Sequence, residues 1–187
     1  MKKLTVALFL GGMVFLPSIS KSQAFEQGKS NVSIGYGTEN ITQKLIKASS
    51  SNASFSVLGP MFVKYEYGVS ENIGFGLNLA YASAGYTYDD GSGSYSWTGI
   101  SSNARLNYHF GSHEKFDPYW GVGMGYKTAI WQSTLTDPDS EPVMGALIPL
   151  GFETTFGARY MVTKNIGFYG EVGISKAIAQ FGINAKF

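Results

Sequence analysis

The last eleven residues, 177–187, read AIAQFGINAKF. Every second residue from Ala177 to Phe187 is apolar, whereas Gln180, Asn184 and Lys186 fall on the opposite face, and this period of two predicts a β-strand with one apolar side. A soluble domain rarely stops inside a strand with an aromatic carboxy-terminus. A closed barrel can do so, because its last strand pairs with its first and leaves no edge. The segment therefore predicts the closing strand of a barrel.

The amino-terminus has the features of a secretory signal peptide. Lys2 and Lys3 precede an apolar run over residues 4–16, and a Ser-Gln-Ala sequence ends at Ala24. The run is shorter than the roughly 20 apolar residues that a spanning helix needs, so an uncleaved anchor is the less favoured alternative. We expect residues 1–24 to be a cleaved signal peptide and residues 25–187 to form one barrel domain.

The composition narrows the class of protein. The chain has no cysteine, so it has neither a lipid-attachment cysteine nor disulfides. This excludes the lipoprotein and small disulfide-stapled classes. Charged residues are 14% of the chain, against about 25% in typical soluble domains, while aromatic residues reach 15% and glycines number 24. Without residues 1–24 the chain has 11 basic and 13 acidic residues, a net charge of −2 that does not suggest a nucleic-acid partner.

Eight segments alternate between apolar and polar positions. They cover residues 29–37, 53–67, 73–87, 96–110, 118–130, 146–160, 166–174 and 177–187. In each segment the charged residues fall on the face opposite the apolar one. The apolar face of the second segment includes Phe55 and Val57 in this assignment.

Some positions depart from this pattern. Pro60 and Pro149 lack the N–H that a sheet requires, so we expect a β-bulge near each of them. Tyr86, Tyr88 and Trp97 fall on the polar phase, where we expect the strands to extend beyond a membrane and the in/out rule to lapse.

Periodicity alone does not say which face is inside, but three features favour an apolar exterior. Connections after the second, fourth and sixth segments are short, whereas those after the first, third and fifth are longer, which is typical of membrane barrels. The polar face alternates charges with glycine, which suits the narrow interior of eight strands. Apolar-face aromatic residues gather near the short turns, as an interfacial girdle would. The predicted girdle comprises Tyr65, Tyr67, Phe75, Tyr108, Phe110, Trp120, Tyr160, Phe168 and Phe187. The sequence therefore predicts an all-β, eight-stranded antiparallel up-and-down transmembrane β-barrel.

Two stretches, PYWGVGMGY (118–126) and GARYMVTKNIGF (157–168), resemble the small outer-membrane β-barrel family that includes OmpA-type transmembrane domains and OmpX-like proteins. The resemblance implies a Gram-negative outer-membrane location with both termini in the periplasm. Because the chain stops at Phe187, we expect the peptidoglycan-binding domain of full-length OmpA-like proteins to be missing. The terminal residues resemble the signal that the barrel-assembly machinery recognises, carried here by Phe181, Gly182, Ile183, Ala185 and Phe187.

The charged residues of the inner face are the candidate site: Lys64, Glu66, Arg105, Lys127, Glu153, Arg159 and Glu171. The favoured interpretation is an ion-pair and hydrogen-bond network that fills the lumen, and the alternative is an ion path or an active site. Counting across the 161–165 turn places Thr155 opposite Glu171 and brings Glu153 and Glu171 close together. These two carboxylates then need a cation, which Arg159, Lys127 or Arg105 could supply.

Catalysis has little support in the sequence. Lipid A deacylases and acyltransferases of this architecture place Ser or His on the barrel surface, whereas only His109 and His113 are available here, near a short turn. We expect no enzymatic activity, no cofactor and no metal. Asp137, Asp139 and Glu141 could bind divalent cations that bridge lipopolysaccharide phosphates, although such a run is more often a solvated loop.

Two classes of function remain open. The favoured one is a non-enzymatic outer-membrane protein with a structural or surface-interaction role, and the alternative is a narrow pore for small solutes or ions. A lipid A-modifying enzyme and a secreted soluble ligand-binding barrel are less favoured. The expected partners are outer-membrane lipid, lipopolysaccharide and, during biogenesis, the barrel-assembly machinery, and the expected state is a monomer. The role of residues 38–52, which include a possible helical turn at 41–48, stays open.

Overall fold

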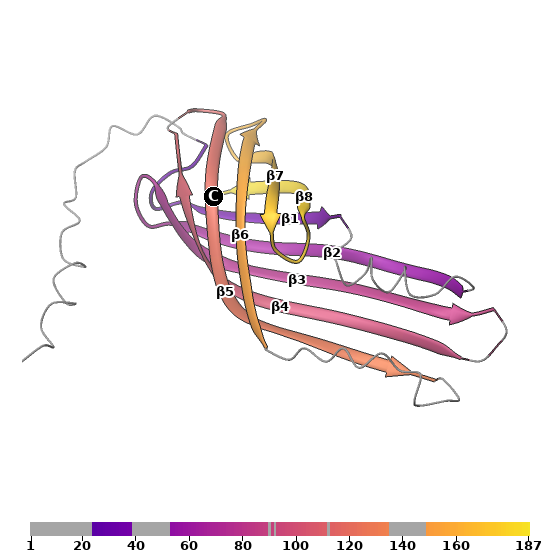
Figure 1. Ribbon diagram of the computed structural model, residues 1–187. Helices are drawn as coiled ribbons and strands as arrows, with labels where there is room; N and C mark the ends of the chain where they lie inside the picture. Colours follow the sequence, from indigo (N-terminus) through magenta and orange to yellow (C-terminus); the bar gives the residue numbers. More distant parts are fainter. Residues whose placement is uncertain (1–23, 39–52, 90, 92, 112, 135–148) are drawn as a thin grey trace, which may run out of the picture.

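The barrel closes on itself. The structure, a computed structural model, describes residues 24–38, 53–89, 91, 93–111, 113–134 and 149–187. These residues form eight strands: β1 (Ser30–Gly37), β2 (Ala53–Gly68), β3 (Ile73–Tyr88), β4 (Ser94–His109), β5 (Phe116–Ser133), β6 (Leu150–Met161), β7 (Ile166–Ile174) and β8 (Ala179–Lys186). Each strand pairs antiparallel with its sequence neighbours, and β1 pairs with β8 (Figure 1). The predicted fold class and strand number are confirmed. Among the residues described, no helix is long and apolar enough to cross a membrane.

The carboxy-terminal strand closes the barrel, as the sequence predicts. The β1–β8 ladder begins at the pair Asn31↔Lys186, and next to it Ser30 and Phe187 exchange two backbone hydrogen bonds of 2.9 and 3.0 Å. Pairing the first and last strands satisfies backbone groups that would otherwise form two open edges.

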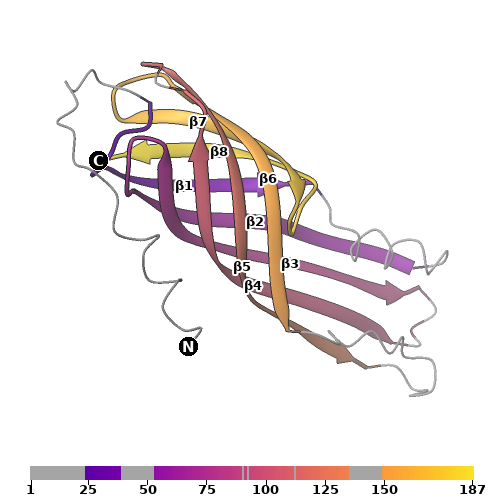
Figure 2. The ribbon, with the colours of Figure 1, turned by 60° about the vertical axis from the view of Figure 1, so that its left-hand side comes forward.

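Strands β2 to β5 continue past the closed part of the barrel. β1 pairs with β2 only over residues 61–67, and β6 pairs with β5 only over residues 116–126. Residues 53–58, 82–88, 94–99 and 128–133 therefore form a four-stranded sheet beyond the ring, which we call the extension (Figures 1 and 2). The short turns 69–72, 110–115 and 162–165 lie at the other end. The β3–β4 connection, residues 89–93, is shorter than predicted because both strands run further than the periodicity indicates.

A β-bulge in β2 reverses the phase of its first half. The register shifts between Leu58 and Met61, so Gly59 and Pro60 together oppose one residue of β3. Phe55 consequently pairs with inward-facing Tyr86. The predicted bulge near Pro60 is confirmed, but the assignment of Phe55 and Val57 to the outer face is wrong, because the extra residue turns them inward.

The second predicted bulge is absent from the register of β6. Pro149 precedes β6 and does not interrupt it, and its carbonyl accepts a hydrogen bond of 2.8 Å from the Lys127 N–H. A proline directly before a strand needs no ladder donor. The count of eight strands is therefore unaffected.

An aromatic core lines the inner face of the extension. Tyr86, Tyr95 and Trp97 are buried there together with Ala82 and Ala84. The rings of Tyr86 and Tyr95 stack with centroids 5.3 Å apart, and Tyr88 and Trp131 pack against the same cluster. The expected lapse of the rule that polar residues face inward and apolar residues outward is therefore observed here. Alternation continues, but the residues that face inward change from charged to aromatic.

Candidate functional site

The interior of the closed barrel holds six of the seven charged residues that the sequence singles out, all except Lys127. They project inward because they occupy alternate positions of β2, β4, β6 and β7, and they are almost completely buried. Glycines on neighbouring strands make room for them. A Cβ at Gly121 would lie 2.2 Å from Arg105 Nη2, and one at Gly123 would lie 2.9 Å from Glu153 Oε1. The alternation of charge and glycine therefore fits bulky polar side chains into a narrow lumen.

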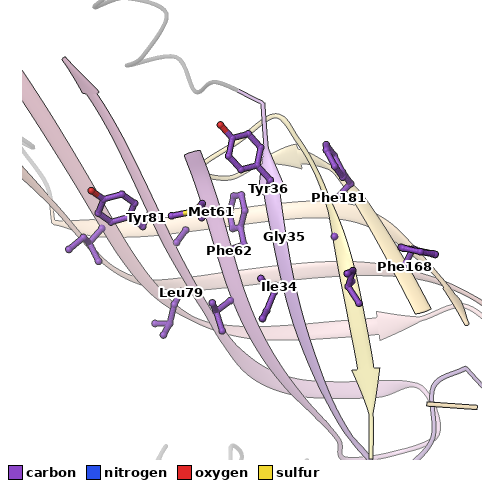
Figure 3. Close-up of a pocket in the computed structure, with 14 residues that line it drawn as sticks. Ile34, Gly35, Tyr36, Met61, Phe62, Leu79, Tyr81, Phe168 and Phe181 are labelled. Atoms are coloured by element: carbon purple, nitrogen blue, oxygen red, sulfur yellow. The ribbon is translucent and has the colours of Figure 1, made fainter. Parts of the chain in front are cut away.

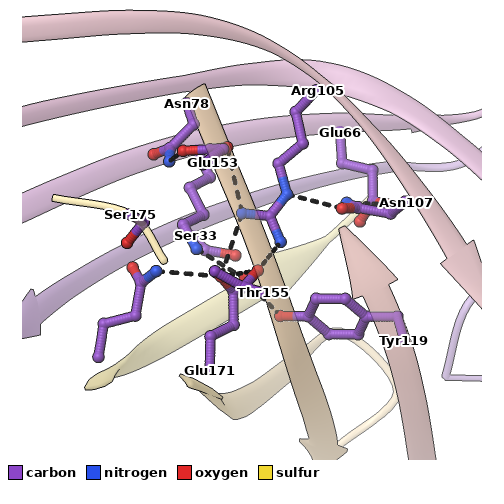
Figure 4. A network of polar contacts seen from close by, with 12 residues as sticks. Ser33, Glu66, Asn78, Arg105, Asn107, Tyr119, Glu153, Thr155, Glu171 and Ser175 are labelled. Atoms are coloured by element: carbon purple, nitrogen blue, oxygen red, sulfur yellow. Dashed lines mark hydrogen bonds and ion pairs between the residues drawn. The ribbon is translucent and has the colours of Figure 1, made fainter. Parts of the chain in front are cut away.

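The buried charged residues form two clusters. The one further from the short turns, which we call the upper cluster, is centred on Arg105 (Figure 4). Its Nη1 lies 3.3 Å from Glu153 Oε1 and 3.1 Å from Glu171 Oε2, so one guanidinium bridges two carboxylates. Lys64 Nζ lies 2.6 Å from Glu171 Oε1. Further hydrogen bonds to the two carboxylates come from Asn78, Asn103, Tyr119, Thr155 and Gln180. Buried carboxylates require these ion pairs and hydrogen bonds, because an uncompensated charge in the interior has a large desolvation cost.

The second cluster lies nearer the short turns than the first, and we call it the lower cluster. It is centred on His109. His109 Nε2 lies 2.9 Å from Glu66 Oε1, and Nδ1 lies 2.7 Å from Asp117 Oδ1. Arg159 joins the same two carboxylates, with Nη2 at 2.6 Å from Glu66 Oε2 and Nη1 at 3.3 Å from Asp117 Oδ2. Both ring nitrogens of His109 face carboxylate oxygens, and both can donate only in the imidazolium form.

Asn107 connects the two clusters. Its side-chain amide donates to Glu66 Oε1 at 2.6 Å, and its carbonyl oxygen accepts from Arg105 Nε at 2.6 Å. With His109 protonated, the two clusters hold equal numbers of cationic and anionic groups. The cations are Lys64, Arg105, His109 and Arg159, and the anions are Glu66, Asp117, Glu153 and Glu171. The interior is thus a continuous, charge-balanced polar network.

Six of the seven predicted network residues meet in this network, and one does not. Lys127 lies opposite Ser101 on the inward phase of β5, but its side chain is exposed above the buried clusters. The predicted register is also wrong by two residues, since Glu171 pairs with Gly157 and not with Thr155. Glu153 and Glu171 nevertheless share a cation as expected, and Arg105 provides it.

Sequence reasoning missed His109 and Asp117 as network members. His109 follows Arg105 and Asn107 at alternate positions of β4, so the same alternation that places Arg105 in the lumen also indicates a lumen position for His109. Asp117 lies one residue before the fifth predicted segment, whereas β5 begins at Phe116. Both lie close to a short turn, at the end of the alternating pattern, where its phase is a weak indication of a lumen position.

Residues 24–26 close the lower end of the lumen. Phe25 is 2% exposed, and its ring stacks on the His109 imidazole with a centroid separation of 3.5 Å. Glu26 Oε1 lies 2.6 Å from Lys186 Nζ. Gly68 permits this arrangement, because a Cβ there would lie 2.3 Å from the Glu26 carbonyl oxygen. The chain directly after the predicted cleavage point therefore packs into the barrel.

The network offers no obvious chemistry. Both nitrogens of His109 are engaged by carboxylates, so the ring is not oriented toward a nucleophile. Within the described parts of the chain, no group of three or more His, Cys, Asp or Glu side chains could hold a metal ion. Residues 137–141, the other candidate cation site, lie outside the described residues, as do residues 1–23 and most of the 38–52 segment.

The outer face of the closed barrel is apolar. All nine predicted girdle residues are exposed there. Trp120 stacks on Phe156 with centroids 6.1 Å apart, and Tyr108 contacts Phe110 edge to face. Of the predicted assembly signal, Phe181, Ile183 and Phe187 are exposed on this face, and Ala185 is half-buried.

A hollow of about 790 Å³ interrupts this outer face over β1 to β4, β7 and β8 (Figure 3). Apolar side chains line it, including Ile34, Val63, Leu79 and Phe181, with Tyr36 and Tyr81 among the lining residues. The Tyr36 hydroxyl accepts a hydrogen bond of 3.2 Å from the N–H of Gly59 in the bulge. A volume of this size is within the range of ligand pockets.

A closed eight-stranded meander with a charged interior and an apolar exterior defines the class of small outer-membrane β-barrels. No protein-family model matches the sequence, and no curated protein matches it either. Several solved barrels are similar in structure. The outer membrane protein W of E. coli shares 16% identity, with 87% of this chain and 99% of that chain covered and a TM-score of 0.48.

Two further solved barrels are also similar in structure. Ail, the attachment invasion locus protein of Yersinia pestis, solved with the heparin analogue sucrose octasulfate, shares 16% identity over 87% of this chain and 100% of that chain, with a TM-score of 0.49. The N-terminal β-barrel domain of Pseudomonas aeruginosa OprF shares 15% identity over 86% and 98%, with a TM-score of 0.43. These likenesses concern the barrel architecture alone.

Proposed function

We propose that the chain is an integral outer-membrane protein whose barrel is closed to ions and which acts without catalysis, as a structural or surface-interaction protein. The observation that carries the proposal is the continuous buried network in the lumen, combined with an apolar exterior. Water solvates charges far better than lipid does, so a barrel with its charges inside and Leu, Ile and Phe outside is adapted to a membrane.

The closed state is supported by the geometry at three levels of the lumen. The upper cluster joins β2, β4, β6 and β7 through Arg105, Glu171 and Lys64. The lower cluster joins β2, β4, β5 and β6 through His109 and Arg159. Phe25 covers the lower cluster from below. An ion entering the lumen would have to separate several buried ion pairs at once, which is unfavourable.

The test uses mature protein refolded into lipid vesicles. Vesicle flotation and heat-modifiable gel mobility measure insertion and folding, and planar-bilayer recording measures conductance. We expect co-flotation, a mobility shift on heating and no discrete openings. Recovery of folded protein in a detergent-free soluble fraction would overturn the membrane proposal, whereas stable openings from inserted protein would overturn only the closed lumen.

The narrow-pore alternative rests on one specific observation. Among the described residues, buried polar side-chain atoms without a hydrogen-bond partner occur on several strands, and those of Asn31, Tyr169 and Asn184 lie on the β1, β7 and β8 side of the lumen. Buried polar atoms are usually paired with protein or water. A thin hydrated path along this wall would account for them, and the same bilayer recording distinguishes it from the closed barrel.

A further inference from the structure

The polarity of the barrel wall inverts along β2 to β5. In the closed part, charges face inward and apolar residues outward. In the extension the inward residues are Tyr86, Tyr95 and Trp97, while outward positions carry hydroxyls, among them Thr87, Ser96 and Thr98. Within the described extension, no outward position of these four strands is charged. This inversion marks the level at which the wall leaves the hydrocarbon.

The hydroxyls are arranged in rows across the sheet. The last largely apolar row runs through Tyr36, Met61, Tyr81 and Ile100. The next outward row contains Ser83 paired with Thr98, flanked by exposed Leu58 and Ile130 at the sheet edges. The row after that contains Ser56 and Ser96, both exposed. Successive rows on one face are about 7 Å apart along a strand.

The height of these rows matches lipid headgroups. The headgroup layer is roughly 5–8 Å deep on each side of a hydrocarbon core of about 30 Å. One or two rows above Tyr81 and Ile100 therefore lie at headgroup depth. The apolar hollow of about 790 Å³ opens on the same face, directly below the Ser83 row. A lipid whose acyl chain occupies the hollow must place its headgroup against these hydroxyls.

We propose that the outward face of the extension, carried by Ser56, Ser96 and Thr98, is a docking surface for the phosphorylated sugar headgroup of outer-leaflet lipopolysaccharide. The inference rests on the proposed outer-membrane function. Hydroxyls donate to phosphate oxygens and exchange hydrogen bonds with sugar hydroxyls. The outward positions of the four strands carry no carboxylate, and the nearest one, Asp89 in the adjoining turn, lies beyond the Ser56 row, where it accepts a hydrogen bond of 3.1 Å from Ser54 Oγ. Continuity with the lipid-facing band selects this occupant over a soluble glycan.

The experiment compares two vesicle compositions with the mature chain. One contains phosphatidylcholine with lipopolysaccharide that carries its core sugars, and the other contains phosphatidylcholine with phosphatidylglycerol at equal charge. The triple variant Ser56→Ala, Ser96→Ala, Thr98→Val removes the hydroxyls. The control is Ser102→Ala, which removes an exposed hydroxyl from the same face of β4 within the apolar band. The readout is the midpoint temperature of heat-modifiable mobility, taken as the difference between vesicle types, so that a variant's own stability cancels.

We expect the wild type to unfold several degrees higher with lipopolysaccharide than with phosphatidylglycerol. The triple variant should lose at least half of that difference, and Ser102→Ala should retain it. A triple variant that retains the full difference overturns the inference, as does a wild type that floats with both vesicle types but shows no difference. Failure to float with either type would instead contradict the proposed membrane function.

Discussion

Arg105 is the residue on which the interior depends most. Its guanidinium bridges Glu153 and Glu171 and reaches Asn107, so it links the two clusters. Removal leaves Glu153 without its cation, whereas Glu171 keeps Lys64 at 2.6 Å.

We expect Arg105→Met to destabilise the refolded barrel by about 3–5 kcal/mol, as the loss of one partner of a buried pair does. Urea unfolding in detergent micelles, followed by tryptophan fluorescence, measures the change. Lys127→Met is the matched control, because the Lys127 side chain is exposed and a surface substitution changes stability by about 0.5 kcal/mol or less. Equal effects of the two variants would mean that the ion pairs add nothing to stability.

Among the elements, the β2 bulge depends on Gly59. This residue has a φ of +80°, and a Cβ there would lie 2.8 Å from the Tyr81 carbonyl oxygen. We expect Gly59→Ala to cost about 1–3 kcal/mol from the unfavourable backbone conformation alone. Gly170→Ala in β7 is the control, since its nearest contact would be at 3.9 Å. Urea unfolding of both variants in one detergent provides the comparison, and a neutral Gly59→Ala would contradict the bulge.

The β7–β8 turn, residues 175–178, carries a pH-sensitive lysine. Burial and, to a lesser degree, the neighbouring Lys127 ammonium lower the pKa of Lys176 to about 8, and its ammonium lies 6.0 Å from the centroid of the Trp97 ring. In the unfolded chain the pKa of a lysine is about 10.4. Between these two values the unfolded chain binds more protons than the folded one, so stability rises with pH.

We expect the wild-type midpoint of heat-modifiable mobility to rise as the pH increases from neutral through this window. Lys176→Met, which has no ammonium to desolvate, should rise less. Lys164→Met, in the β6–β7 turn, serves as the control for general alkaline effects and should behave like the wild type. A Lys176→Met variant with an unchanged pH response would exclude this lysine as the cause.

At the scale of the whole molecule, the position of the membrane follows from the polarity inversion of the wall. Leu79 and Ser83 lie on the same outward face of β3, four residues apart, on opposite sides of the inferred boundary. The boundary therefore predicts different tolerance of charge at the two positions.

We expect Leu79→Arg to disfavour folding into bilayers by about 2–4 kcal/mol, whereas Ser83→Arg should cost about 0–1 kcal/mol. Reversible unfolding of the vesicle-inserted protein in guanidinium measures both. Asn103→Lys tests the interior independently and should be harmful, because Asn103 is buried and donates to Glu153 at 3.0 Å. Equal tolerance at Leu79 and Ser83 would place the boundary elsewhere.

The fold was largely readable from the sequence, whereas the site was readable only in part. Alternation identified eight strands, because one face of each strand contacts lipid and the other the lumen. The same rule failed for Phe55, since a bulge changes phase without changing composition. It also could not assign Arg105 to its two carboxylates, because those contacts join strands that are separated by 48 and 66 residues.

The sequence by itself determined the class of protein and, outside the first half of β2, the direction in which each strand face points. Period-two patterning is a local property, and the segment 177–187 shows it through to Phe187. Only the tertiary structure decided which charges meet, that His109 and Asp117 belong to the network, and that Phe25 covers it. The physical reason is that the register between strands sets the distances between side chains on different strands, and the alternation within one strand does not encode that register.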